Sequence, residues 1–251
     1  MPEEPIRLFT TDPSERASWE GLRDLAEVLP LGWSLAGGTL VRLHTTERNA
    51  ASTRSTTDID LILDIRAHPR TKHNVGHALS GCGFRIAQPP NPAGHDHRWE
   101  RPVAGERDIK AQIDVLAPSG LRPSTYEKKF PGIGRLLATR GAQFGIDRSE
   151  LVTVTVDDEL TLTVNRPDAI GALYEKCSAL LNHSDTKKRR HYEDINQLCA
   201  VLDFEDRQAL GDLRQKELKR LSWGIEQTII ALGTQTDERT QRVERLIRRR
   251  N

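Results

Sequence analysis

Hydrophobic residues recur at helical spacing near the start of the chain. Asp12 is a candidate N-cap, and Pro13 occupies the first helical position. An apolar face follows at Trp19, Leu22, Leu25, Ala26 and Val28. This pattern predicts a helix over 13–29. Residues 57–65 instead alternate polar and branched apolar side chains, which predicts a strand.

The remaining patterns divide the chain into two parts. Further strands are predicted at 31–36, 84–87 and 109–116, a helix at 71–80, and a hairpin formed by 152–156 and 160–164. Two segments rich in glycine or proline are predicted to be irregular, 88–96 and 118–149. After Pro167 the pattern becomes helical, at about 167–182, 186–202, 205–219, 220–232 and 236–249. We therefore expect an α/β domain over 1–165 and a helical domain over 166–251.

Composition limits the classes of protein that fit. The chain is 36% hydrophobic and 29% charged with a net charge of +1, so it should fold, and any basic surface must be local. The three cysteines are odd in number and match no zinc spacing, which favours a reducing, cytoplasmic environment. The acidic N-terminus and the lack of a long apolar stretch predict neither a signal peptide nor a membrane span.

Two aspartates on the predicted strand 57–65 are the first candidates for chemistry. Asp58 and Asp60 lie two positions apart, so both carboxylates should face the same side while Ile59 packs on the other. Neighbouring carboxylates repel one another unless a cation lies between them, and Mg²⁺ prefers such oxygen ligands together with substrate phosphates. The alternative is that both aspartates line a solvated strand face.

A glycine turn precedes that strand. Gly37, Gly38 and Thr39 connect a predicted strand to a helix. Glycines allow a phosphate to approach the backbone, and a helix N-terminus offers free N–H groups to it. The spacing is neither that of a P-loop nor that of the GxGxxG fingerprint. The candidate role is therefore phosphate binding, and the alternative is an ordinary tight turn.

A third aspartate occupies another predicted strand. Asp114 has apolar neighbours, and strand interiors disfavour aspartate. It could be the third carboxylate of a two-metal site, where it would activate an attacking hydroxyl. Alternatively, it pairs with a nearby cation such as Lys110 or Arg107.

The order of these three elements resembles the DNA polymerase β-like nucleotidyltransferases. The most specific match is the segment Arg54-Ser55-Thr56-Thr57-Asp58-Ile59-Asp60-Leu61, which is similar to a motif of the AbiE-type toxin nucleotidyltransferases, including the mycobacterial MenT group. The resemblance covers about residues 30–200. It implies an α+β fold with a mixed sheet flanked by helices, followed by a C-terminal helical bundle that completes the active-site cleft.

The resemblance also implies roles for residues that the strand pattern does not single out. It implies that Lys176 contacts the nucleotide phosphates and that Asp194 is one of the catalytic residues. It also favours Arg54 as a further residue that contacts the nucleotide. On sequence alone, a lysine such as Lys176 is more often a surface residue than a phosphate ligand. The alternatives for Arg54 are that it pairs with Asp58 or only braces its loop. The basic run 187–190 favours an anionic partner such as an RNA backbone, or is a solvated loop.

Together these residues imply a Mg²⁺-dependent enzyme, with Mn²⁺ as an alternative ion, that transfers a nucleotide from a nucleoside triphosphate. The resemblance implies a toxin that adds a nucleotide, expected to be a pyrimidine nucleotide, to the 3′ end of transfer RNA and so inhibits translation, with a cognate antitoxin as partner. DNA and membranes are not expected partners. The alternatives are transfer to a protein or small-molecule hydroxyl, and a non-catalytic module that binds nucleotide or RNA.

Overall fold

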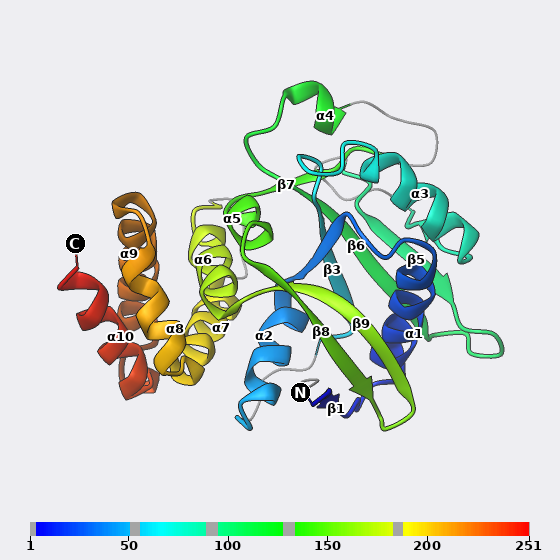
Figure 1. The fold of residues 1–251 in the computed structure, drawn as a ribbon. Helices are drawn as coiled ribbons and strands as arrows, with labels where there is room; N and C mark the ends of the chain where they lie inside the picture. Colours follow the sequence, from blue (N-terminus) through cyan, green and yellow to red (C-terminus); the bar gives the residue numbers. More distant parts are fainter. Residues whose placement is uncertain (1–3, 51–55, 89–94, 128–133, 183–187, 251) are drawn as a thin grey trace.

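The computed structural model describes residues 4–50, 56–88, 95–127, 134–182 and 188–250, and Figure 1 shows how its elements are arranged. The strands are β1 Ile6–Leu8, β2 Trp33–Ala36, β3 Asp58–Leu63, β4 Arg85–Ile86, β5 Arg98–Pro102, β6 Lys110–Pro118, β7 Leu137–Thr139, β8 Ser149–Val156 and β9 Leu160–Pro167. The helices are α1 Pro13–Val28, α2 Gly37–Glu47, α3 Thr71–Gly81, α4 Pro123–Glu127, α5 Ala142–Ile146, α6 Ala169–Ala179, α7 Lys188–Val201, α8 Phe204–Ala209, α9 Gln215–Leu232 and α10 Glu238–Arg248. Within these ranges, no helix combines the length and apolar character needed to cross a membrane.

The central sheet is mixed, which confirms the predicted α+β class. Its strand order is β2-β3-β6-β5-β4, and β7 pairs with the end of β6. β3 and β6 run parallel, whereas β2 and β5 run antiparallel to their neighbours in the sheet. The register places Asp60 opposite Asp114, and Asp58 opposite Gln112. Parallel pairing thus brings together carboxylates that are far apart in the sequence.

Helix α1 forms as its pattern predicts. The side chain of Asp12 accepts a hydrogen bond from the backbone N–H of Ser14, and Pro13 begins the helix. Trp19, Leu22 and Leu25 are buried in the core that α1 forms with the sheet. Burying three such side chains contributes on the order of 6 kcal/mol before the entropy of ordering is subtracted. This helix therefore packs against the face of the sheet that carries Ile59, Leu61 and Leu63.

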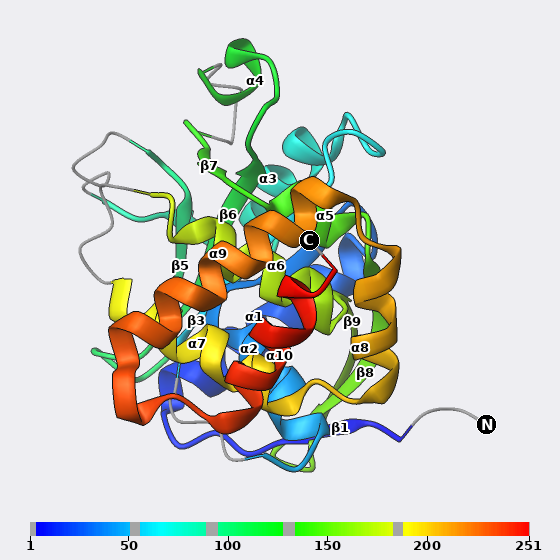
Figure 2. The ribbon, with the colours of Figure 1, turned by 90° about the vertical axis from the view of Figure 1, so that its left-hand side faces the viewer.

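The C-terminal helices build a second core. Helix α6 packs against α7 and α9, and α10 packs on α9 and α7. α9 lies close to α6 because Gly224 has no side chain where a Cβ would meet Cys177. Figure 2 shows α9 and α10 as the outer layer of this part. Leu40 and Val41 of α2 also belong to this second core, so α2 joins the helical part to the sheet. The division into two domains at residue 165 stays a prediction.

Several predicted boundaries were wrong. The expected helices 205–219 and 220–232 are instead α8, a 3-10 turn at Leu210–Asp212, and the long α9. The chain is extended at Leu213 and Arg214. The backbone N–H and the guanidinium group of Arg214 donate hydrogen bonds to the carboxylate of Glu217 in the first turn of α9. The segment 118–149, expected to be irregular, contains α4, β7 and α5.

Besides β7, two strands were not predicted at all, β1 and β5. β1 pairs in parallel with β8 of the predicted hairpin, and β5 pairs with β4 and β6. β5 was not predicted because its sequence, Arg-Trp-Glu-Arg-Pro, is mostly charged and only Trp99 is buried. Its hydrogen bonds to β4 and β6, rather than an apolar face, define it as a strand. The loop predicted at 88–96 lies mostly outside the described residues.

Candidate active site

The two aspartates of β3 lie on the same face of the strand, as the alternation predicted. Ile59, between them, is buried in the core on the opposite face. The carboxylate of Asp58 accepts hydrogen bonds from Thr56 Oγ1 at 2.7 Å and from Gln112 Nε2 at 3.3 Å. These contacts orient Asp58 without neutralising its charge.

Asp60 packs directly against the glycine turn. Gly37 adopts a φ of +68°, and any Cβ at this position would overlap the carboxylate of Asp60. Both facts require glycine here. Burial raises the pKa of Asp60 to about 7, and the charges of Asp114 and Asp58 act in the same direction, while Lys176 and Arg190 oppose them. A cation bound here would relieve this clustering of negative charge.

Helix α2 begins at Gly37, so its N-terminus faces Asp60. No side chain caps this helix end. Gly37 and Gly38 line the pocket, and backbone N–H groups at such a terminus can bind an anion. Thr39 is placed differently. It is buried, and its Oγ1 donates a hydrogen bond to the carbonyl oxygen of Asp58 at 3.1 Å, so its hydroxyl braces β3.

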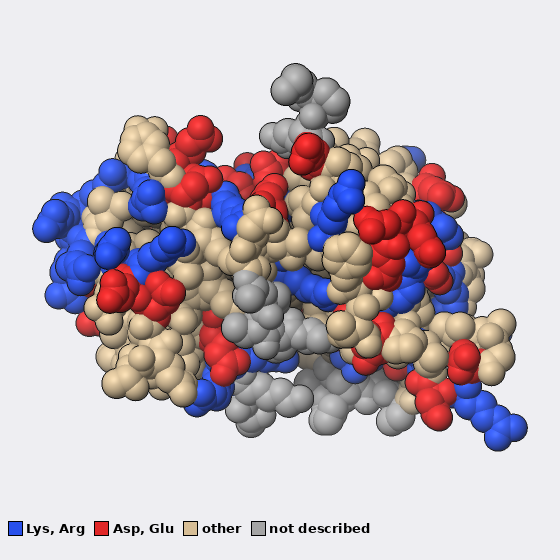
Figure 3. All heavy atoms as spheres, turned by 90° about the horizontal axis from the view of Figure 1, so that it is seen from below, with Lys and Arg blue, Asp and Glu red and all other residues tan. Residues whose placement is uncertain are grey.

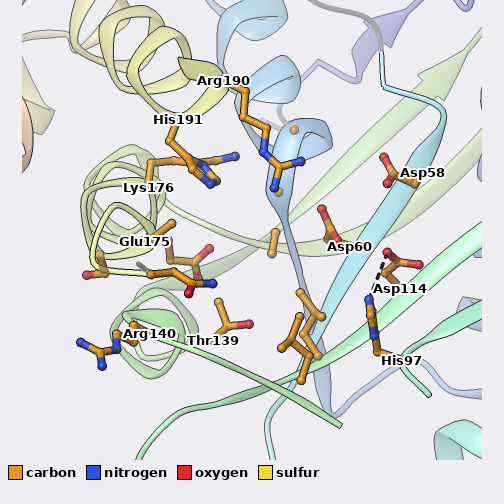
Figure 4. A pocket seen from close by; sticks show the side chains of 18 of the residues that line it. Asp58, Asp60, His97, Asp114, Thr139, Arg140, Glu175, Lys176, Arg190 and His191 are labelled. Atoms are coloured by element: carbon orange, nitrogen blue, oxygen red, sulfur yellow. Dashed lines mark ion pairs between the residues drawn. The ribbon is translucent and has the colours of Figure 1, made fainter. Parts of the chain in front are cut away.

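Asp114 is buried beside Asp60 and is held by an arginine. Arg98 on β5 donates two hydrogen bonds to its carboxylate, Nε to Oδ1 at 3.0 Å and Nη2 to Oδ2 at 2.9 Å. His97 Nε2 lies 3.8 Å from Asp114 Oδ2 (Figure 4). Asp114 therefore has a cationic partner that the sequence did not suggest, while Lys110 pairs with Glu100.

Lys176 and Asp194 lie on the opposite wall of the pocket. Lys176 of α6 donates a hydrogen bond to Asp194 of α7 at 2.6 Å, and both side chains are buried. An ion pair at this depth requires good geometry to offset the desolvation of both charges. Figure 4 shows Lys176 and Arg190 reaching toward the pocket from α6 and α7, across from Asp60.

These groups line one pocket of about 590 Å³. It brings together seven of the predicted site residues, Gly37, Gly38, Asp58, Asp60, Asp114, Lys176 and Asp194. Thr39 is not among the lining residues, and Arg54 lies outside the described residues.

Other lining residues were not predicted as site residues. They include His97, Arg98, Thr139, Arg140, Glu175, Arg190 and His191. Only Arg190 had a sequence signal, the basic run at the start of α7.

The donor set fits Mg²⁺ only if a substrate completes it. Among the described residues, no three His, Cys, Asp or Glu side chains form a group that could hold a metal ion. Arg98 donates two hydrogen bonds to Asp114, and its Nη2 also lies 3.9 Å from Asp58 Oδ2. Asp58 and Asp60 lie on the pocket side of β3, beside this guanidinium group. Two carboxylates completed by phosphate oxygens are a usual arrangement for Mg²⁺.

Comparison with known proteins agrees with this architecture. No protein-family model matches the chain, and no curated protein matches it significantly. The structure is similar to that of an antigenic nucleotidyltransferase-like protein from Paracoccidioides brasiliensis, with a TM-score of 0.55 and 13% sequence identity. The match covers 93% of this chain and 94% of the other. The chain therefore has the mixed α+β fold of a nucleotidyltransferase-like protein.

Proposed function

We propose that the protein transfers a nucleotidyl group from a nucleoside triphosphate to an acceptor hydroxyl, with release of pyrophosphate. One observation carries the proposal. Asp58 and Asp60 face Lys176 and Arg190 across a single pocket, and the uncapped N-terminus of α2 opens into it. Paired carboxylates suit a divalent cation, and the cations and free N–H groups suit a polyphosphate.

The residues divide between positioning and charge neutralisation. Asp58 and Asp60 would hold Mg²⁺, with Mn²⁺ as the alternative ion. When bound, the ion would neutralise charge developing on the phosphoryl oxygens. Gly37 and Gly38 would bind the triphosphate through backbone N–H groups. Such preorganised contacts account for most of the catalysis in phosphoryl transfer.

Lys176 and Asp114 would act on the two reacting partners. Asp194 accepts one hydrogen bond from the Lys176 ammonium group, which has three protons to donate, so two remain for phosphate oxygens. Arg98 occupies two of about four acceptor positions on the Asp114 carboxylate, so Asp114 can still accept a hydrogen bond from the acceptor hydroxyl.

The acceptor we propose is the 3′ end of transfer RNA, which would make the protein a translation-inhibiting toxin with a cognate antitoxin. The support is the similarity of segment 54–61, followed by Lys176 and Asp194, to the AbiE-type toxins. Figure 3 also shows Lys and Arg side chains gathered at the end of the molecule formed by α9 and α10. The exposed cations there include Lys216, Lys219, Arg245 and Arg249. Such a surface favours an RNA backbone.

The test is incubation of the protein with total transfer RNA, Mg²⁺ and each labelled nucleoside triphosphate in turn. Asp60→Asn removes one carboxylate charge from the pocket, and Asp158→Asn removes one from an exposed turn as a matched control. We expect label in RNA with the wild type and with Asp158→Asn only. Label in protein or a small molecule, with RNA untouched, would contradict the acceptor. Nucleotide binding that survives Asp60→Asn, with no product in any assay, would contradict the enzyme.

A further inference from the structure

Arg98 of β5 is a cation of the pocket without an assigned role. The register of the sheet places Arg98 directly opposite Asp114 of β6, and Asp114 opposite Asp60 of β3. Trp99, the next residue of β5, is buried in the core on the other face of the sheet. Residues that are directly opposite on neighbouring antiparallel strands have Cβ atoms about 5 Å apart. The fold therefore keeps Arg98 beside Asp114, in one row with Asp60.

The guanidinium group of Arg98 lies against two of the three carboxylates on this wall of the pocket. Its Nε and Nη2 donate hydrogen bonds to the two oxygens of Asp114, at 3.0 and 2.9 Å. The same Nη2 lies 3.9 Å from Oδ2 of Asp58. In two-metal sites, a pair of ions about 3.5–4 Å apart neutralises carboxylates that are grouped in this way. Here Arg98 already supplies a positive charge between Asp114 and Asp58.

The charges on this wall of the pocket fit one divalent cation. Asp58, Asp60 and Asp114 carry three negative charges when ionised, and the guanidinium group of Arg98 offsets one of them. Arginine stays protonated in proteins, so this positive charge is permanent. One divalent ion offsets the other two charges. A second ion would have to bind at Asp114, next to the guanidinium group, whose charge repels it.

We propose that the guanidinium group of Arg98 takes the place of a second metal ion, so that the pocket binds a single divalent cation, on Asp58 and Asp60. The inference rests on the proposed function, since it assumes that this pocket binds a nucleoside triphosphate together with a divalent cation. Arg98 is then a positioning residue, which holds the Asp114 carboxylate in place for the acceptor hydroxyl. On this proposal Asp114 is not a metal ligand, although the sequence pattern favoured that role.

Counting the bound ions tests the inference without turnover. The probes are Mn²⁺ and the α,β-methylene analogues of CTP, UTP, ATP and GTP, in which CH₂ replaces the oxygen atom that leaves with pyrophosphate. In equilibrium dialysis, free Mn²⁺ and free analogue reach equal concentrations on both sides, so the excess on the protein side is bound. We expect the wild type to retain about one Mn²⁺ for each analogue, whereas a two-metal site would retain about two.

Electron paramagnetic resonance of the same complexes gives an independent measurement. Two Mn²⁺ ions about 3.5–4 Å apart couple magnetically, and their spectrum differs from that of an isolated ion. We expect the spectrum of the wild-type complex to be that of isolated Mn²⁺.

Variants of Arg98 separate its charge from a structural role. Arg98→Ala frees the carboxylate of Asp114 and should raise the ratio to about two Mn²⁺ for each analogue, with a magnetically coupled spectrum. Arg98→Lys keeps the positive charge and should retain a single ion. Arg148→Ala is the matched control, because it removes an arginine that donates two hydrogen bonds to Asp168 outside the pocket lining. This control should also retain a single ion.

Each remaining outcome contradicts a defined part of the reasoning. A wild-type protein that retains two Mn²⁺ for each analogue overturns the inference, whether or not any variant folds, and leaves the proposed function standing. An Arg98→Ala variant that retains the analogue with a single Mn²⁺ also overturns it, because Arg98 then does not exclude a second ion. A second ion in Arg148→Ala overturns it as well, because the loss of an ion pair elsewhere would have the same effect. A wild-type protein that retains no analogue contradicts the proposed function itself.

Discussion

The substitution Glu175→Gln should stabilise the folded protein, and by an amount that depends on pH. The carboxyl group is buried, its Oε1 has no hydrogen-bond partner within the part of the chain that the structure describes, and its pKa is raised from an ordinary 4.5 to about 8, chiefly by burial. An acid with a raised pKa in the folded state destabilises that state once the pH exceeds its unfolded pKa. Glutamine has nearly the same shape and does not ionise in either state.

The magnitude follows from the two pKa values. Below pH 4.5 the carboxyl group is protonated in both states, so the substitution should change little. Between pH 4.5 and 8 the unfolded chain ionises and the folded protein does not, which costs the folded state about 1.4 kcal/mol per pH unit. The expected gain in unfolding free energy for Glu175→Gln is therefore about 2 kcal/mol at pH 6 and about 4 kcal/mol at pH 8.

Thermal unfolding at pH 4, 6 and 8 would measure this effect. A gain of that size at pH 8 corresponds to a rise in Tm of roughly 10 °C for a chain of this length. Glu238→Gln, at a side chain that is 86% exposed, is the matched control and should change the unfolding free energy by less than about 0.5 kcal/mol. An equal gain at all three pH values, or a loss of stability at pH 8, would show that Glu175 is ionised in the folded protein.

Three further single substitutions and one double variant test the pocket. Asp60→Asn should lower nucleotidyl transfer by about 10³-fold or more and leave the protein folded. Chelation of divalent cations should have the same effect on the wild type. Activity that is retained in either experiment would show that the reaction does not use a metal ion. Gly37→Ala should lower the unfolding free energy by about 1–3 kcal/mol in denaturant titrations, because a Cβ there overlaps Asp60 and the φ is positive. Lys176→Met should lower the unfolding free energy by about 3–5 kcal/mol, because it removes the ammonium group from a buried ion pair with Asp194. Adding Asp194→Leu should recover most of that stability without restoring transfer, and recovery of transfer would assign the ion pair a purely structural role.

Local patterns in the sequence determined those features that depend on neighbouring residues. The Asp12 cap and the apolar spacing specified α1, because both act within one or two turns of helix. Alternation placed Asp58 and Asp60 together, because the geometry of a strand repeats every two residues. The hairpin of β8 and β9 and the glycine at position 37 were likewise visible, since turns and close backbone approaches demand particular residues.

Only the tertiary structure decided which distant groups meet. Parallel pairing of β3 and β6 sets Asp60 beside Asp114, and the charged strand β5, which has no apolar pattern, brings Arg98 to Asp114. Packing of α6 against α7 and α5 determines the partner of Lys176 and the burial of Glu175. Such pairings depend on strand register and helix packing between segments far apart in the chain, and the desolvation that raises a pKa depends on everything that surrounds the group. The local pattern of residues therefore predicts neither these pairings nor the shifted pKa values.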